Sequence, residues 1–232
     1  MAVTGSGRSG RVLLPGRSVG VPIDGPVAAG RATPNRPLGF SDWHRRRPRF
    51  GVWAVEVGTP RIKGWLRHAR RALGPLLLEG YRRPPHVTVF AVGFPCERAE
   101  CPADASWEEI AAQALLLSRL GPAPFRLRLG PVRSFAAAPY FAVRDAGPLA
   151  EVRALLARFR PDDRSVPYTP HITVGLYRQP WPLSAVAHRI RRGIPRVPPV
   201  VIPVRRLAFL TYNSRDIAGP LRREISAPLP RK

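Results

Sequence analysis

Two five-residue segments of this chain have almost the same sequence and carry residue types suited to acid–base chemistry. Residues 85–89 read Pro-His-Val-Thr-Val and residues 170–174 read Pro-His-Ile-Thr-Val, with the two histidines 85 positions apart. In a β-strand, side chains two positions apart point to the same face, so each histidine shares a face with its threonine. Two such strands lying together would surround a small anion with two imidazoles and two hydroxyls, from His86, Thr88, His171 and Thr173.

Paired histidines and threonines of this kind suit chemistry at a phosphate. Imidazole titrates near neutral pH, so one ring can accept a proton from an attacking water or hydroxyl while the other donates a proton to the departing oxygen. The threonine hydroxyls would donate hydrogen bonds to the phosphoryl oxygens, which hold negative charge through the transition state. This mechanism needs no covalent enzyme intermediate, metal or cofactor, and we predict none.

The residues around the motifs support two other kinds of site less well. A zinc site with two histidine ligands would need a third ligand such as a carboxylate or thiolate, and neither motif contains Asp or Glu. A Ser–His–Asp hydrolase is disfavoured because the chain lacks a Gly-x-Ser-x-Gly nucleophile elbow. A single His-x-Thr-Val would mean little, but two copies that each follow a proline favour a paired site.

The elements that must position the motifs repeat as well. Hydrophobic periodicity predicts a strand, a helix and a motif strand twice, at 51–57, 60–73 and 85–94 and again at 139–145, 147–160 and 168–177. The other predicted elements are a helix that begins after Ser106, strands at 125–135 and 200–212, and a helix at 184–192. A strand–helix–strand unit used twice predicts two pseudo-symmetric lobes, each contributing one motif strand to a shared cleft.

The composition divides the chain into two parts and indicates a polyanionic partner. Residues 1–47 are rich in Gly, Pro, Arg and Ser without a sustained period, so we predict a disordered tail before one domain at 48–232. The net charge is +23, with 38 basic residues against 15 acidic ones. Such a basic chain favours RNA binding through phosphate contacts, although a solvated arginine surface explains the charge equally well.

The cysteines and the hydropathy predict a cytoplasmic protein. Cys96 and Cys101 do not form a C-x-x-C motif and have no second pair, so we expect two free thiols in a reducing compartment. No apolar run approaches the ~18 residues that a membrane helix needs. We therefore expect no membrane association.

The duplicated His86-Val87-Thr88-Val89 and His171-Ile172-Thr173-Val174 segments closely resemble the two H-x-[ST]-x motifs of the 2H phosphoesterase superfamily. The nearest branch is the bacterial 2′-5′ RNA ligase / RNA 2′,3′-cyclic phosphodiesterase family, and the resemblance covers about residues 48–230. It implies an α+β fold of two lobes, with antiparallel sheets flanking a central cleft and helices on the outside. It also implies an enzyme that opens 2′,3′-cyclic phosphates on RNA or nucleotides, with 2′-5′ RNA ligase activity from the same site.

The resemblance assigns roles to the motif residues. It implies that His86 is the acid and His171 the base in hydrolysis, with Thr88 and Thr173 holding the phosphate. The sequence alone does not orient the two histidines. Candidates for base stacking or phosphate contacts nearby are Tyr168, Arg178, Tyr140, Arg82 and Arg83.

Two alternatives to this enzyme stay open, and we expect a monomer in each case. One is a non-catalytic RNA- or nucleotide-binding module that uses the same pocket. The other is a basic protein whose tail binds nucleic acid while its domain acts on a small metabolite.

Overall fold

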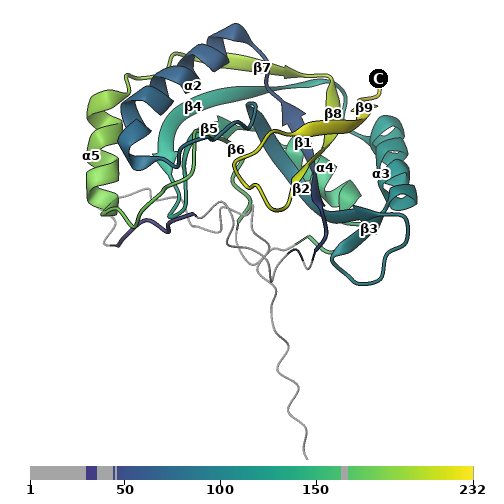
Figure 1. Cartoon of the computed structure of the whole chain (residues 1–232). Helices are drawn as coiled ribbons and strands as arrows, with labels where there is room; N and C mark the ends of the chain where they lie inside the picture. Colours follow the sequence, from purple (N-terminus) through teal and green to yellow (C-terminus); the bar gives the residue numbers. More distant parts are fainter. Residues whose placement is uncertain (1–29, 36–43, 45, 163–166, 232) are drawn as a thin grey trace, which may run out of the picture.

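The computed structural model describes residues 30–35, 44, 46–162 and 167–231, which form two curved sheets with helices around them (Figure 1). One sheet has the strand order β3-β2-β1-β8-β9 and the other β6-β5-β4-β7. The first contains β1 (Arg49–Glu56), β2 (His86–Cys96), β3 (Asp104–Ser106), β8 (Arg206–Asn213) and β9 (Arg222–Pro228). The second contains β4 (Phe125–Ser134), β5 (Pro139–Arg144), β6 (His171–Thr173) and β7 (Val200–Val204). Apart from the parallel pair β2–β3, paired strands are antiparallel, which confirms the predicted α+β class.

The helices begin and end largely where local signals place them. They are α2 (Pro60–Leu73), α3 (Trp107–Leu120), α4 (Pro148–Leu156) and α5 (Leu183–Gly193), with a 3₁₀ turn at Gly74–Leu76. The side chain of Thr59 accepts a hydrogen bond from the first turn of α2, and that of Ser106 does the same for α3. Across the described residues, no helix combines the length and the apolar character needed to cross a membrane.

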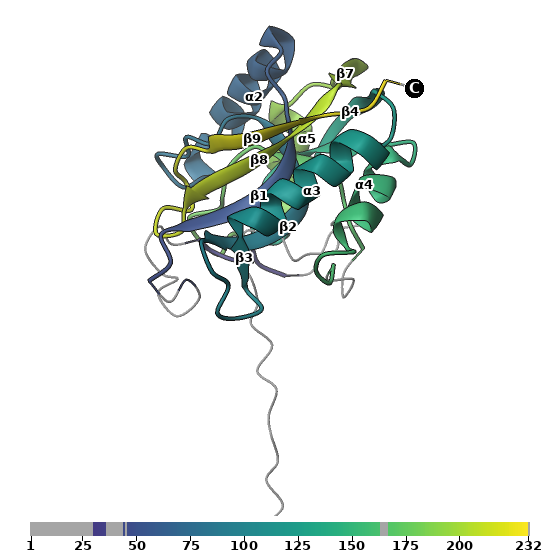
Figure 2. The same cartoon turned by 90° about the vertical axis from the view of Figure 1, so that its right-hand side faces the viewer.

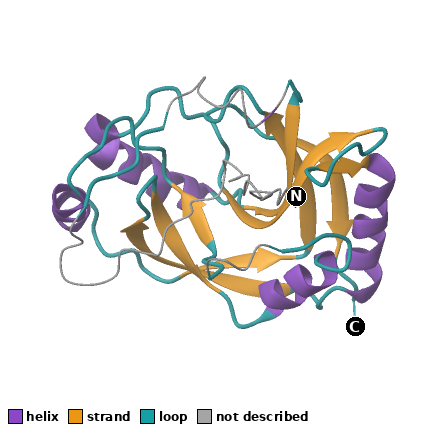
Figure 3. Cartoon of the chain, turned by 90° about the horizontal axis from the view of Figure 1, so that it is seen from below, coloured by secondary structure: helices purple, strands orange, loops and turns teal. Residues whose placement is uncertain are grey.

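Each motif strand closes a strand–helix–strand unit, as predicted, but the helix of each unit packs on the other lobe. Helix α2 follows β1 of the first sheet, yet it contacts α5, which packs on β4 of the second sheet. Helix α4 follows β5 of the second sheet, yet it contacts α3 and β2 of the first. The two helix pairs consequently lie at opposite ends of the molecule (Figure 3). The lobes are interlocked, so neither unit can be removed without exposing the core of the other.

One hydrophobic core joins the two sheets. It takes Val55 and Val87 from the first sheet and Phe141 and Ile172 from the second, all nearly inaccessible to solvent. The residues between His and Thr in the two motifs, Val87 and Ile172, both lie in this core, as their alternation predicts. The opposite face of the first sheet carries a second, smaller cluster of buried residues, which consists of Phe50, Val52, Ala54, Phe94, Ala208, Leu210 and Tyr212. Figure 2 shows this sheet with α3 and α4 beside it.

The strand predicted at 200–212 is in fact two strands in different sheets. Residues 200–204 pair with β4 of the second sheet, and residues 206–213 pair with β1 of the first. The chain crosses between the sheets at Arg205. Alternating burial in β7 and continuous burial in β8 distinguish the two segments, because β8 lies between two other strands and is covered on both faces.

Two other elements are shorter than predicted. The strand expected at 168–177 is confined to His171–Thr173, and it begins directly after Pro170, which has no N–H to donate to a ladder. The helix expected to reach Arg160 ends at Leu156 and tightens into a turn, in which the amides of Arg158 and Phe159 donate to the carbonyls of Leu155 and Leu156. Strands β3 and β9 were not predicted.

The structure differs from the predicted disordered tail at residues 30–35, which pack on the domain. The amide of Ala32 donates to the carbonyl of Trp181 and that of Thr33 to the carbonyl of Ala136, both at 2.7 Å. The Asn35 side chain donates to the carbonyl of Ala137 at 2.9 Å. Ala32 is 3% exposed and belongs to the main core. A hydrophobicity pattern could not reveal this contact because it depends mostly on backbone hydrogen bonds to loops. The rest of the predicted tail, apart from residues 44, 46 and 47, lies outside the described residues.

Candidate active site

The fold brings the two motif strands together although they belong to different sheets. Strand β2 contacts β6 directly, and within each sheet the register places His and Thr on one face. His86 pairs with Glu56 on the neighbouring strand, and His171 pairs with Ala142. Strand β6 is the edge strand of its sheet, so no strand of its own sheet pairs with its outer side.

The two histidines have the same local geometry. The Nδ1 atom of His86 lies 2.8 Å from the carbonyl oxygen of Pro84, and Nδ1 of His171 lies 2.8 Å from the carbonyl oxygen of Thr169. A carbonyl oxygen only accepts hydrogen bonds, so in both rings Nδ1 carries the proton and donates it. Each neutral ring therefore has its proton-accepting site at Nε2, and the backbone carbonyl holds the ring in orientation.

The electrostatic surroundings keep both imidazoles neutral at neutral pH. The pKa of His86 is lowered to about 4, mainly by burial and to a smaller extent by the nearby Arg83 and His171, against the opposing effect of the Pro84 carbonyl. Burial also lowers the pKa of His171, which the Thr169 carbonyl partly offsets. The repulsion between the two rings reflects their closeness. An anion bound between them would replace that repulsion with attraction and raise the pKa of both.

Two aromatic rings support His171. Tyr140 stacks on Phe135 with 4.0 Å between ring centroids. Both rings meet the imidazole of His171 edge to face, at 5.4 and 5.0 Å. Tyr140 is completely buried between these contacts. The structure thus places it against the ring of His171, and its predicted contact with a substrate stays a prediction.

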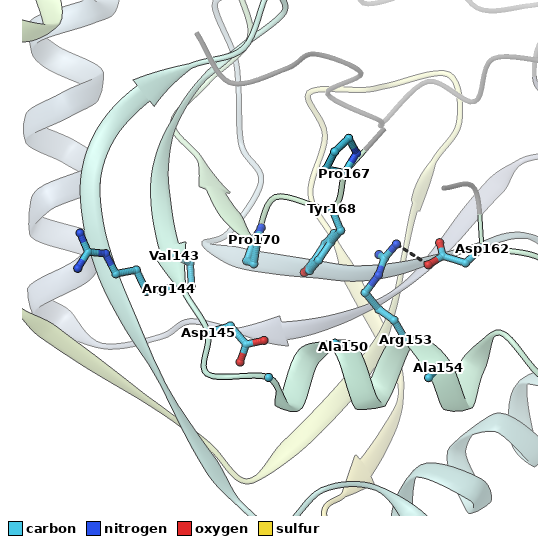
Figure 4. Close-up of a pocket in the computed structure, with 11 residues that line it drawn as sticks. Val143, Arg144, Asp145, Ala150, Arg153, Ala154, Asp162, Pro167, Tyr168 and Pro170 are labelled. Atoms are coloured by element: carbon cyan, nitrogen blue, oxygen red, sulfur yellow. Dashed lines mark hydrogen bonds and ion pairs between the residues drawn. The ribbon is translucent and has the colours of Figure 1, made fainter. Parts of the chain in front are cut away.

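Tyr168 connects the two motif segments. Its hydroxyl donates to the carbonyl oxygen of Thr88 at 2.8 Å, and its ring lies 4.0 Å from the Arg153 guanidinium carbon. Arg153 in turn donates to the carbonyl oxygen of Val89 at 2.7 Å. Burial raises the pKa of Tyr168, which keeps the phenol protonated and able to donate. Tyr168 also lines a pocket of about 850 Å³ between the end of β5, α4 and the segment before β6 (Figure 4).

The three candidate arginines lie in different surroundings. Arg83 packs over the ring of Tyr212, with 3.9 Å from its guanidinium carbon to the ring centroid, and is close enough to His86 to lower the pKa of that ring. Arg82 is largely exposed and forms an ion pair with Asp216 at 3.0 Å. Arg178 is exposed, and its backbone amide donates to the carbonyl of Leu76. Of the three, Arg83 is the one that the structure places beside a motif histidine.

The sequence analysis missed two residues, Arg70 and Tyr81, that contact the motif segments in the folded protein. Arg70 of α2 donates from Nε to the carbonyl oxygen of Val174 at 2.8 Å and from Nη2 to that of Arg83 at 3.4 Å. Arg70 thus links the last residue of the second motif to a segment just before the first. Tyr81 lies beside it, with 5.3 Å from the Arg70 guanidinium carbon to the ring centroid, and its hydroxyl is hydrogen-bonded to Thr173.

Sequence signals for these two residues were present but weak. Arg70 lies one turn after Leu66 and one turn before Leu73, both on the buried stripe of α2, which is an unusual place for an arginine. Tyr81 directly precedes the Arg82-Arg83 pair that the sequence did single out.

A carboxylate lies near the first motif, although neither motif contains one. Glu56 pairs with His86 across the strands, and Arg223 of β9 binds it at 2.9 and 3.0 Å. Across the described part of the chain, no three His, Cys, Asp or Glu side chains gather in a metal-binding arrangement.

Comparisons with known proteins agree with this architecture. The 2′-5′ RNA ligase superfamily model matches residues 59–216. TT0787 of Thermus thermophilus is 20% identical, with a TM-score of 0.50, over 78% of this chain and 97% of that one. E. coli LigT in its apo form is 16% identical, also with a TM-score of 0.50, over 80% of this chain and 99% of that one. No curated protein matches the sequence.

At these identities the solved structures show a shared fold, while the family match rests on the sequence itself. The matched segment covers more than half of the chain and includes both histidine motifs. This confirms the family resemblance, and the chain belongs to the 2′-5′ RNA ligase superfamily of 2H phosphoesterases.

Proposed function

We propose that the protein is a metal-independent phosphoesterase that opens 2′,3′-cyclic phosphates on RNA ends or nucleotides. The observation that carries this proposal is the paired geometry of His86 and His171. Both lie on contacting strands of different lobes, and both are held through Nδ1 by a carbonyl so that Nε2 is the reactive nitrogen. Thr88 and Thr173 share their strand faces and would donate hydrogen bonds to the phosphoryl oxygens.

The proposed reaction moves two protons. One neutral Nε2 takes a proton from water as its oxygen attacks phosphorus, and the bond from phosphorus to one ribose oxygen breaks. The other, protonated Nε2 gives its proton to that ribose oxygen, so the product is a phosphomonoester next to a free hydroxyl. If a 5′-hydroxyl of a second RNA attacks in place of water and the bond to the 3′ oxygen breaks, the same steps form a 2′-5′ linkage.

Both histidines are neutral in the free protein, because burial lowers the pKa of each ring. A neutral ring is what a general base requires, so either histidine meets that condition before substrate binds. The family resemblance implies that His171 is the base and His86 the acid. The basic limb of the pH–rate profile tests this assignment, because it should move in the variant that alters the acid.

Substrate contacts follow from the surroundings of the site. Arg83 is the proposed phosphate contact, since it lies beside His86 and is held over Tyr212. The ring of Tyr168 lines the pocket beside the segment before the second motif. Arg178 is exposed shortly after that motif. Both are proposed contacts for the rest of the nucleotide.

Hydrolysis of a 2′,3′-cyclic nucleotide in the presence of EDTA tests this proposal. Wild-type protein should form a phosphomonoester at an undiminished rate with the chelator, and His86→Ala and His171→Ala should each lose about 10²–10⁴-fold in rate while remaining folded by circular dichroism. Full activity in both variants would refute the mechanism. Nucleotide binding without turnover in wild type would instead favour the binding-module alternative.

A further inference from the structure

Helices α2 and α5 form a basic outer surface that the proposed chemistry does not use. Its exposed residues, called here the α2–α5 face, are Arg61, Lys63, Arg67, Arg71, Arg189, Arg191, Arg192 and Arg196. Neither helix contains an acidic residue, and residues 57–78 and 164–215 contain no Asp or Glu. The fold therefore brings together two segments that contain no Asp or Glu.

Direct contacts hold the two helices together. The Nε of Arg189 donates to the carbonyl oxygen of Ala72 at 2.7 Å, and the His68 ring lies 3.2 Å from the carbonyl oxygen of Gly193. On α2, Lys63, Arg67 and Arg71 are four residues apart and form one row along the helix. Helix α2 has 14 residues, so the face is about 20 Å long, which is enough for several nucleotides of a single strand.

The charge on this face is uncompensated, in contrast to the other helix pair. Around α3 and α4, arginines are neutralised by carboxylates, as in the pairs Arg160–Glu109 and Arg153–Asp162. Within the described residues, no ion pair includes a member of the α2–α5 face. Neighbouring like charges repel, so this arrangement costs stability when no anion is bound.

The face also ends next to the proposed catalytic site. Arg70, which adjoins Arg71 at the end of α2, donates hydrogen bonds to the carbonyls of Val174 and Arg83 beside the two motifs. A strand whose end lies between His86 and His171 can therefore continue onto α2.

We propose that the α2–α5 face binds the phosphate backbone of an RNA strand whose end is held between the catalytic histidines. This inference rests on the proposed function for the position of the RNA end. A membrane is a poorer fit, because a membrane-bound helix exposes large apolar side chains. Among the residues that the structure describes, the exposed large hydrophobic side chains lie elsewhere, at Leu115, Leu120, Phe159 and Val201.

Two triple variants with equal charge loss test the assignment in the full-length protein. The first removes charge from the face, as Arg67→Gln/Arg71→Gln/Arg192→Gln. The control removes three exposed arginines from other surfaces, as Arg98→Gln/Arg119→Gln/Arg158→Gln. The probe is a fluorescein-labelled single-stranded RNA of about 15 nucleotides, and its affinity is measured by anisotropy over a range of salt concentrations.

We expect the face variant to bind this RNA about tenfold or more weakly, and its slope of log affinity against log salt to fall by about 2, or about 0.7 for each lost phosphate contact. The control variant should bind like wild type, and both variants should hydrolyse a 2′,3′-cyclic mononucleotide at the wild-type rate. Equal weakening in both variants would overturn the assignment, and so would binding to phosphatidylserine vesicles in preference to RNA. If wild type shows no hydrolysis, the proposed function fails, whereas the binding comparison still tests the face.

Discussion

The Arg70→Met variant tests whether the link between the two motif segments matters for catalysis. Methionine keeps much of the aliphatic volume of arginine but removes the guanidinium that donates to the carbonyls of Val174 and Arg83. Each of these carbonyls belongs to a segment that carries a motif. Without the link, the separation between the two histidines depends on fewer contacts.

The expected loss follows from the two hydrogen bonds. A bond from a charged donor contributes about 1.5–3 kcal/mol, and the bond at 2.8 Å to Val174 falls in that range. The bond at 3.4 Å to Arg83 is at the limit of useful geometry and contributes little. Burial lowers the pKa of Arg70, which shows that burying its charge has a cost that methionine avoids. We therefore expect the free energy of unfolding to fall by about 2 kcal/mol.

Catalysis should suffer more than stability. A displacement of a catalytic group by about 1 Å can lower a rate by about 10²-fold, so we expect kcat for a 2′,3′-cyclic nucleotide to fall by about that factor in Arg70→Met. Arg70→Lys, which keeps a charge and can reach Val174, should recover part of the rate. The exposed neighbour Arg71→Met is the control and should match wild type in both stability and kcat. A destabilised Arg70→Met protein with unchanged kcat would show that Arg70 supports the fold only, and would refute this positioning role.

Three further predictions follow from individual contacts. The pKa of His86 is about 4 in the folded protein against 6.5 for the free side chain, so the unfolded state binds the proton more readily and acid favours unfolding. About 3 kcal/mol of stability should therefore be lost as the pH falls from 6.5 to about 4. Urea unfolding of His86→Gln should show a shallower pH dependence than that of wild type. Asn35→Ala should lower the free energy of unfolding by about 1–2 kcal/mol, because it removes the hydrogen-bond donor to the 135–138 loop. The control Thr33→Ala, in which an exposed side chain is shortened, should change the free energy of unfolding by less than about 0.5 kcal/mol. Equal effects of the two variants in thermal unfolding would contradict the packing of residues 30–35 on the domain. Thr88→Val and Thr173→Val keep the side-chain shape but remove the hydroxyl, and each should lower kcat by about 10²-fold. Thr173→Val also removes the hydrogen-bond partner of Tyr81 and should lower the free energy of unfolding by about 1 kcal/mol. Wild-type rates would exclude these hydroxyls as phosphate donors.

Periodicity and capping predicted most of the fold because the signals are local. Thr59 and Ser106 begin their helices as expected, and the core residues Val87 and Ile172 follow from the alternation of the motifs. The crossing of the chain between sheets at Arg205 was missed, since a strand that changes sheets and one that continues have the same apolar pattern. The packing of each helix on the opposite lobe is likewise a tertiary property that no local pattern carries.

The candidate site was also predictable only where the signal is local. His86, Thr88, His171 and Thr173 were identifiable from type and spacing, because a strand fixes which side chains share a face. The surroundings were not identifiable in the same way. Tyr140 is buried and packs against His171, and Arg70 reaches the site from a helix whose other arginines face solvent. Such contacts depend on how distant segments meet, and sequence spacing does not encode that distance.

A double-mutant cycle on His86 and His171 tests the central claim most directly. The rate of hydrolysis of a 2′,3′-cyclic nucleotide is measured for wild type, for His86→Ala, for His171→Ala and for the double variant, all at neutral pH. If the two rings act as a unit in one acid–base step, each single variant loses about 10²–10⁴-fold and the double variant loses little more than the worse single. Losses that multiply in the double variant, or a single variant that keeps the wild-type rate, would contradict the paired mechanism.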